Sequence, residues 1–152
     1  MENPIKQIYK FNQEAGLLDK GYNDRLESSF LIEEALEGFD LSVVSKDYDL
    51  PDTPKELSRA LVESAIIDDI TDVERLDKAC DQVVFAVGAM AKLGLGPNNI
   101  TRALNIVMKA NNAKIKCPKD SMGKLMKPDD FDEKYAPEPQ LQALLDSPNK
   151  GN

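Results

Sequence analysis

The chain has 152 residues, of which 41% are apolar and 30% charged, proportions that are typical of one soluble globular domain with its own core. Its formal net charge of −8 argues against non-specific binding of nucleic acid, because such binding needs lysine and arginine to neutralise phosphates. The absence of histidine excludes a Ser-His-Asp triad, a Cys-His nucleophile pair and an ordinary zinc site. The remaining chemistry is that of carboxylates, lysines and metal ions.

Helical periodicity dominates the chain and strand signals are nearly absent, which predicts an all-α fold. We expect a first helix over residues 4–14, ended by Gly16. Its inward-facing residues are predicted to be Ile5, Ile8, Tyr9 and Phe11. A second helix is expected over residues 25–44, with Asn23 or Asp24 as its N-cap.

Three further helices are expected before the chain changes character. Thr53, Pro54 and Glu56 form a helix start, and that helix should continue to about residue 68. The fourth helix is expected over residues 72–93. After a turn at residues 94–99, Asn99 or Thr101 is expected to cap a fifth helix that ends near residue 115.

The C-terminal part is richer in proline and charge. Residues 117–139 contain four prolines, which predicts an ordered but irregular arm. A short turn over residues 141–145 is expected to dock, and residues from 147 onward are expected to fray. Together these features predict an antiparallel bundle of four to five helices, with a core over about 3–116 and a Pro-rich arm over 117–152, in one domain.

No apolar run is long enough to cross a bilayer, and the first residues lack the layout of a secretion signal. We therefore expect a cytoplasmic protein without a membrane partner. Cys80 lies on an apolar stripe of the fourth helix, so we interpret it as a small core residue and expect no disulfide.

Carboxylates gather on the second and fourth helices. Glu33, Glu34 and Glu37 occupy adjacent turns of the second helix, on the arc opposite Leu31, Ile32, Ala35 and Leu36. They can be a solvated face. However, no lysine or arginine lies between residues 26 and 44 to offset them, and Leu26 and Phe30 share their arc. A partly apolar acidic face is compatible with a covered metal site.

The fourth helix carries the second acidic pair, Asp77 and Asp81, spaced i, i+4. Both border a stripe that we expect to face inward, formed by Val73, Leu76, Cys80, Val84, Val87 and Ala91. Two helices that present carboxylates to each other can hold Mg²⁺, which prefers oxygen ligands. We therefore predict a magnesium site, with Mn²⁺ as a possible substitute, between these helices.

The order of these motifs resembles that of the MazG-like all-α nucleoside triphosphate pyrophosphohydrolases, the superfamily that includes phosphoribosyl-ATP pyrophosphatase and dimeric dUTPases. The family's Glu-Glu-x-x-Glu matches residues 33–37, and its Asp before an apolar run matches Asp81. Its Asn-x-x-Lys matches Asn111 and Lys114, and a Lys-Pro tail matches residues 123–128. The sequence departs from the usual Glu-x-x-Asp, because Lys78 stands three positions before Asp81; Asp77 is the expected substitute.

The resemblance implies hydrolysis of a nucleoside triphosphate to a monophosphate and pyrophosphate. We expect Glu34, Glu37, Asp77 and Asp81 to bind the metal, and Glu33 or Glu34 to act as the catalytic base. Asn111, Lys114 and Lys127 are expected to bind the substrate, although each can also be an ordinary cap or a solvated lysine. The resemblance also implies a homodimer or homotetramer, for which residues 60–70 supply apolar surface.

Two other functions fit the same residues. One is a non-enzymatic helical adaptor whose acidic face meets a basic partner. The other is a degenerate member of the family that binds nucleotides without hydrolysing them, which Lys78 in the second motif would explain.

Overall fold

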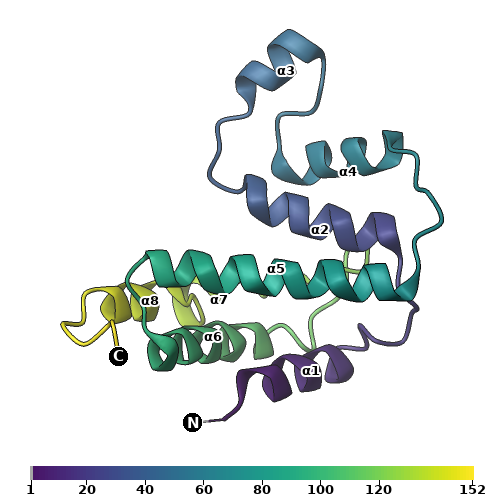
Figure 1. The fold of residues 1–152 in the computed structure, drawn as a ribbon. Coiled ribbons are helices and arrows are strands. Elements are labelled where there is room, and N and C mark those ends of the chain that lie inside the picture. The colour runs from purple at the N-terminus through teal and green to yellow at the C-terminus, as the bar shows by residue number, and fades with distance from the viewer. Residues whose placement is uncertain (1) are drawn as a thin grey trace. The chain divides into compact units, whose positions relative to one another are not determined.

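The computed structural model describes residues 2–152, and within that range it contains eight helices and no strand beyond an isolated bridge between Lys119 and Leu125 (Figure 1). The prediction of an all-α helical bundle is confirmed. The helices form two compact units, residues 21–71 and residues 2–20 with 72–152, and each is described by itself. The prediction of a single domain, which was made from chain length, stays a prediction.

The helix α1 (Pro4–Glu14) has the predicted bounds. Asn3 caps its start, where the side-chain Oδ1 accepts a hydrogen bond from the Ile5 backbone N–H at 2.9 Å. It ends at Glu14, and Gly16, two residues further on, has a φ of +63° that suits glycine. The prediction that Ile5 and Tyr9 face inward is wrong, because both side chains are exposed. The side of α1 that is turned away from solvent carries Ile8 and Phe11 and continues to Ala15.

The smaller unit contains α2 (Asp24–Leu36), α3 (Ser42–Tyr48) and α4 (Pro54–Ser64), with α2 packed on α4. Buried Ser29 and Ser58 lie on these two helices, and the Arg25 guanidinium donates to the Val62 carbonyl oxygen. Small buried side chains let two helices approach closely.

The predicted continuous helix over residues 25–44 is wrong. The chain breaks at Gly38, whose φ is +86°, and α3 begins after Asp40. The Asp40 carboxylate accepts a hydrogen bond from the Ser42 backbone N–H at 3.0 Å, and hydrogen bonds from Ser42 lower the pKa of Asp40. The start of α4 is as predicted: Thr53 Oγ1 accepts from the Glu56 N–H at 3.3 Å and donates to its carboxylate at 3.0 Å. Its end, at Ser64, comes earlier than predicted.

The larger unit is built around α6 (Pro97–Asn112), which packs against α1, α5 (Asp72–Lys92) and α8 (Glu138–Leu145). Its core consists of Leu95, Ile100, Ala103 and Leu144. The predicted docking of the last helix is confirmed, because Leu144 of α8 belongs to this core. The chain turns by 110° between α5 and α6.

The C-terminus is held by hydrogen bonds, so the predicted fraying is wrong. Asn99 is buried and donates to the carbonyl oxygens of Asn149 and Asn152 at 2.8 and 3.1 Å. Asn99 is therefore not a cap, and α6 begins at Pro97 instead. The Gly96 N–H donates to the Lys150 carbonyl at 2.8 Å, and a side chain at Gly96 would collide with the backbone of Gly151.

The predicted inward stripe of α5 is wrong. All of α5 lies in the described part of the chain, and none of its residues is buried. Cys80 is exposed, so its interpretation as a core residue is wrong as well. The reason is that α5 touches the core of its unit only near its C-terminal end, through Met90.

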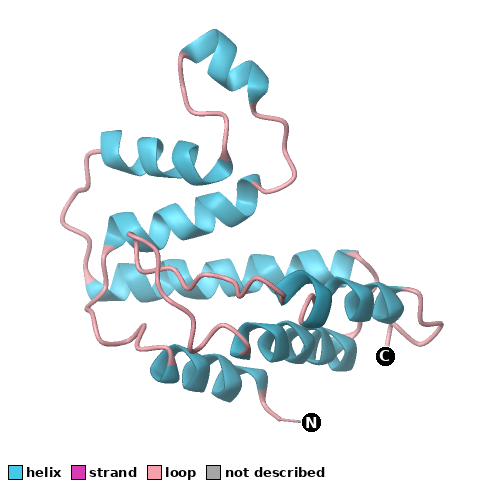
Figure 2. Cartoon of the chain, turned by 180° about the vertical axis from the view of Figure 1, so that it is seen from behind, coloured by secondary structure: helices cyan, strands magenta, loops and turns pink. Residues whose placement is uncertain are grey.

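Between α6 and α8 the arm runs mostly as loop, with the short helix α7 (Phe131–Lys134) near its end (Figure 2). In residues 2–152 no single helix is long and apolar enough to cross a membrane; α5 and α6 pass that test only when they are taken together across their bend.

Candidate functional site

The predicted acidic residues of the smaller unit lie at the end of α2. Glu33 is half-buried and Glu34 is exposed, both within the helix. Glu37 is the residue that ends the helix, with an extended ψ of 132°, so the prediction that all three share one helix is wrong. The break at Gly38 is the cause, since it releases Glu37 from the helical register.

The predicted acidic residues of the larger unit, Asp77 and Asp81, are exposed and lie one turn apart on α5. Because α2 and α5 belong to different units, the convergence of the two acidic groups stays a prediction. Among residues 2–152, no group of three or more aspartate, glutamate or cysteine side chains could hold a metal ion.

The three residues predicted to bind substrate gather around one aromatic ring. Lys114 donates a hydrogen bond from Nζ to the Asn111 side-chain oxygen at 2.9 Å, and the same Nζ lies 4.8 Å from the centroid of the Phe131 ring. The Lys127 Nζ lies 5.1 Å from that centroid. We call Asn111, Lys114, Lys127 and Phe131 the Lys–Phe cluster. It joins the end of α6 to the arm and to α7.

Local backbone structure explains why the arm returns to α6. Past α6 the chain continues in tight turns, in which the Cys117 N–H donates to the Lys114 carbonyl at 2.9 Å. The arm then reverses at a second turn, where the Asp120 carboxylate accepts from the N–H groups of Met122 and Lys124. Gly123 in that turn has a φ of +83°, which favours glycine. This reversal brings Lys127 back toward Lys114.

Phe131 is the anchor of the cluster. It is buried, and its N–H donates to the Pro128 carbonyl at 3.0 Å, which begins the turn of α7. Lysine ammonium groups near an aromatic ring are attracted by the electrons of its face. Both positive charges are therefore held beside the same ring, at the junction of α6 and the arm.

The acidic residues near the cluster are partly engaged by other lysines. The Lys134 ammonium donates to Asp130 at 2.6 Å, which lowers the pKa of Asp130 and raises the pKa of Lys134. Lys127 has one carboxylate partner, Asp132, at 3.9 Å, and both side chains are mostly exposed. An exposed pair at this distance is weak, so a phosphate can compete for Lys127.

Our sequence analysis missed Phe131. The sequence contains a signal for it, because an aromatic residue follows Lys127 by four positions and stands between charged residues of the arm. The arrangement of two ammonium groups, one amide and one ring is suited to an anionic ligand, since both lysines can donate to phosphate oxygens.

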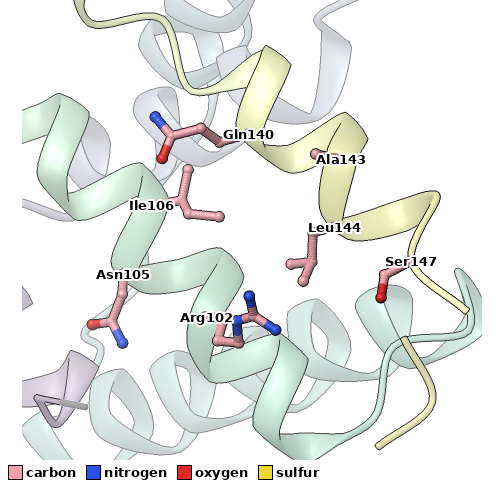
Figure 3. A pocket seen from close by; sticks show the side chains of 7 residues that line it. All are labelled: Arg102, Asn105, Ile106, Gln140, Ala143, Leu144 and Ser147. Atoms are coloured by element: carbon pink, nitrogen blue, oxygen red, sulfur yellow. The ribbon is translucent and has the colours of Figure 1, made fainter. Parts of the chain in front are cut away.

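A separate groove of about 490 Å³ lies between α6 and α8 (Figure 3). None of the residues predicted to form a site lines it; the lining residues are Arg102, Asn105, Ile106, Gln140, Ala143, Leu144 and Ser147. The Arg102 guanidinium donates to Asn99 at 3.1 Å. Within the described residues the buried Asn105 Oδ1 has no hydrogen-bond partner, and the amide nitrogen of the same side chain donates to the Glu2 carbonyl oxygen at 3.4 Å.

Comparison of the chain with protein-family models, with curated proteins and with solved structures finds no match.

Proposed function

We propose that this protein is a Mg²⁺-dependent nucleoside triphosphate pyrophosphohydrolase of the MazG-like type, which converts a nucleoside or deoxynucleoside triphosphate to the monophosphate and pyrophosphate. The observation that carries the proposal is the Lys–Phe cluster. Lys114 and Lys127 are separated by twelve other residues in the sequence, yet their ammonium groups lie within 4.8 and 5.1 Å of one ring centroid. Asn111, the third residue of the expected substrate set, is hydrogen-bonded to Lys114.

The acidic residues suit magnesium by their chemistry. Glu34, Glu37, Asp77 and Asp81 offer only carboxylate oxygens, which Mg²⁺ prefers, and all four are exposed, so their oxygens can reach an ion. When bound, Mg²⁺ supplies positive charge for the triphosphate and lowers the pKa of a water molecule. We assign these four residues to metal binding.

The remaining roles fall to other side chains. Lys114 and Lys127 bind phosphate oxygens and neutralise the charge that leaves with pyrophosphate. The hydrogen bond from Lys114 to Asn111 orients that ammonium group before the substrate arrives. Glu33 or Glu34 accepts a proton from the attacking water as the bond between the α-phosphorus and the bridging oxygen breaks. The half-burial of Glu33 suits a base that is shielded from bulk water.

The direct test is pyrophosphate release from a panel of ribo- and deoxyribonucleoside triphosphates, with Mg²⁺ and then with Mn²⁺. Lys114→Ala and Lys127→Ala should each lower kcat/KM by about 10- to 100-fold, because each removes a charge-assisted hydrogen bond. Lys109→Ala is the matched control, since Lys109 is exposed on α6, five residues before Lys114, and its loss changes the net charge equally. Failure of every nucleotide to release pyrophosphate with either ion would refute the hydrolase proposal.

Metal binding is tested separately by isothermal titration with Mg²⁺ and Mn²⁺. Glu37→Gln and Asp81→Asn should abolish saturable binding, whereas Asp68→Asn, at an exposed position, should preserve it. Divalent binding that survives Glu37→Gln, or no binding at all, would favour the acidic adaptor. Nucleotide binding without hydrolysis would favour the degenerate family member, for which Lys78 is the motivation.

A further inference from the structure

An exposed row of apolar side chains follows the length of α5. Val73, Leu76, Cys80, Val83 and Val87 are spaced alternately by three and four residues, and Met90 continues the spacing to the end of the helix. The exposed fractions of Val73, Leu76 and Val83 are 77%, 67% and 58%, and Cys80 is also exposed. We call these six residues the α5 row.

The spacing of the α5 row is that of the a and d positions of a coiled coil. A mean period of 3.5 residues keeps such a row facing a second helix over its whole length. Since α5 has 21 residues, the row covers almost three heptads, or roughly 30 Å of helix. Only Met90, at one end, packs against the core of the larger unit. A single loop or ligand would cover part of the row, whereas another helix of similar length would cover all of it.

The residues beside the row determine the direction in which a second helix can lie. Asp72 lies on one side of the α5 row and Asp77 on the other, five positions apart. In a parallel pair of identical helices these two positions face each other across the interface, so two carboxylates would repel. In an antiparallel pair the acidic ends lie far apart, and Asp77 is beside the partner's Val84.

The other flanking positions support the antiparallel arrangement. Ala79 and Ala86 occupy one side of the row, and in the antiparallel pair each faces the other residue of the partner. Side chains as small as alanine let two helices approach closely.

We propose that two copies of this chain pair through α5, antiparallel, along the α5 row. In this row Val73, Cys80 and Val87 are the a positions, and Leu76, Val83 and Met90 are the d positions. When each a position lies opposite a d position of the partner, Cys80 faces the partner's Val83 and Val73 faces the partner's Met90. This pairing does not rest on the proposed hydrolase activity. Asp81 lies outside the row, so its replacement tests metal binding without changing the interface.

The first experiment measures the mass of the full chain by light scattering and sedimentation. The wild type should be a dimer at micromolar concentration. Val83→Lys should raise the dimer dissociation constant by about 100-fold or more, because it places a charge in the apolar seam. Phe85→Lys is the matched control: Phe85 is 75% exposed on the same helix but lies outside the row, so the dimer should persist. Circular dichroism should show equal helicity in all three proteins.

The second experiment tests direction and register through cysteine pairing, in a Cys117→Ser background. One chain keeps Cys80, and the other carries Val83→Cys with Cys80→Ser. Oxidation of the mixture should give mostly the mixed disulfide, because opposed positions bring the two sulfurs within bonding reach. A predominance of disulfides between identical chains would overturn the antiparallel arrangement. A monomeric wild type, or a Val83→Lys variant that stays dimeric, would overturn the pairing itself.

Discussion

Replacement of Phe131 by leucine should reveal how much the two lysines contribute to the stability of the Lys–Phe cluster. Phe131 is 4% exposed, and leucine retains most of its apolar volume, so the loss of packing should cost about 1–2 kcal/mol. Leucine has no π face, so both cation–π contacts disappear as well. Lys114, which is half-buried, should account for about 1 kcal/mol. Lys127, whose side chain is 59% exposed, should account for about 0.5 kcal/mol.

The total loss should therefore be about 3 kcal/mol in the free energy of unfolding, measured from urea transitions of equal slope. In a protein that already carries Lys114→Met and Lys127→Met, the same Phe131→Leu replacement should cost only the packing part. The double-mutant cycle then gives a coupling of about 1.5 kcal/mol. A background with Lys109→Met, an exposed lysine of α6, should leave the cost of Phe131→Leu unchanged. A coupling below about 0.3 kcal/mol, which is within the range of additivity, would refute the cation–π account.

Three further predictions concern stability and titration. Leu144→Ala should lower the free energy of unfolding by about 2–4 kcal/mol because Leu144 is part of the core, whereas Leu93→Ala, at an exposed position, should change it by less than about 0.5 kcal/mol in the same urea assay. Asn99→Ala should speed amide hydrogen exchange in the C-terminal turn and cost about 1–3 kcal/mol, since two carbonyl groups lose their donor. The Asp130 carboxyl should titrate below its ordinary pKa of 3.8 by NMR, and Lys134→Met should return the pKa toward that value. Because folding lowers this pKa, the pair stabilises the protein above pH 3.8 and loses its contribution as the pH falls through the folded-state pKa.

Each of these predictions can fail in a defined way. Equal losses in the free energy of unfolding for the Leu144 and Leu93 replacements would mean that Leu144 of α8 does not contribute to the core of its unit. Unchanged exchange after Asn99→Ala would mean that other bonds hold the C-terminus. A pKa of Asp130 that does not respond to Lys134→Met would exclude the ion pair as the cause of its shift.

The helix starts were predictable because they depend on contacts within a few residues. Asn3, Asn23 and Thr53 each cap a helix as their sequence context indicates, through hydrogen bonds that span two or three positions. The break at Gly38 was also predictable from the sequence, since glycine commonly ends a helix and Asp40, two residues later, is a residue type whose carboxylate binds a nearby backbone N–H, here that of Ser42. Apolar residues continue on both sides of this glycine, so hydrophobic periodicity by itself predicts one helix across it.

The candidate site was predictable in part. The residue types that suit magnesium and phosphate were evident from the carboxylate spacing and from the resemblance, which named Asn111, Lys114 and Lys127. Their gathering around Phe131 was not, because it depends on a turn at Asp120 that reverses the arm and on the burial of a ring far from Lys114 in sequence. Whether the acidic groups of α2 and α5 converge also depends on contacts between residues that are distant in the sequence.

The sequence by itself determined the all-α class, most helix starts and the types of side chain that the chain offers to a ligand, because these follow from local hydrogen bonding, periodicity and residue type. Only the tertiary structure decided which faces are buried. Asn99 has the local character of a cap yet lies inside, where it binds the C-terminal carbonyls. Cys80 has the pattern of a core residue yet is exposed, because α5 meets the core of its unit only near Met90. The periodicity of apolar residues shows which side of a helix needs to be covered. Which segment covers it depends on packing between parts of the chain that are distant in the sequence.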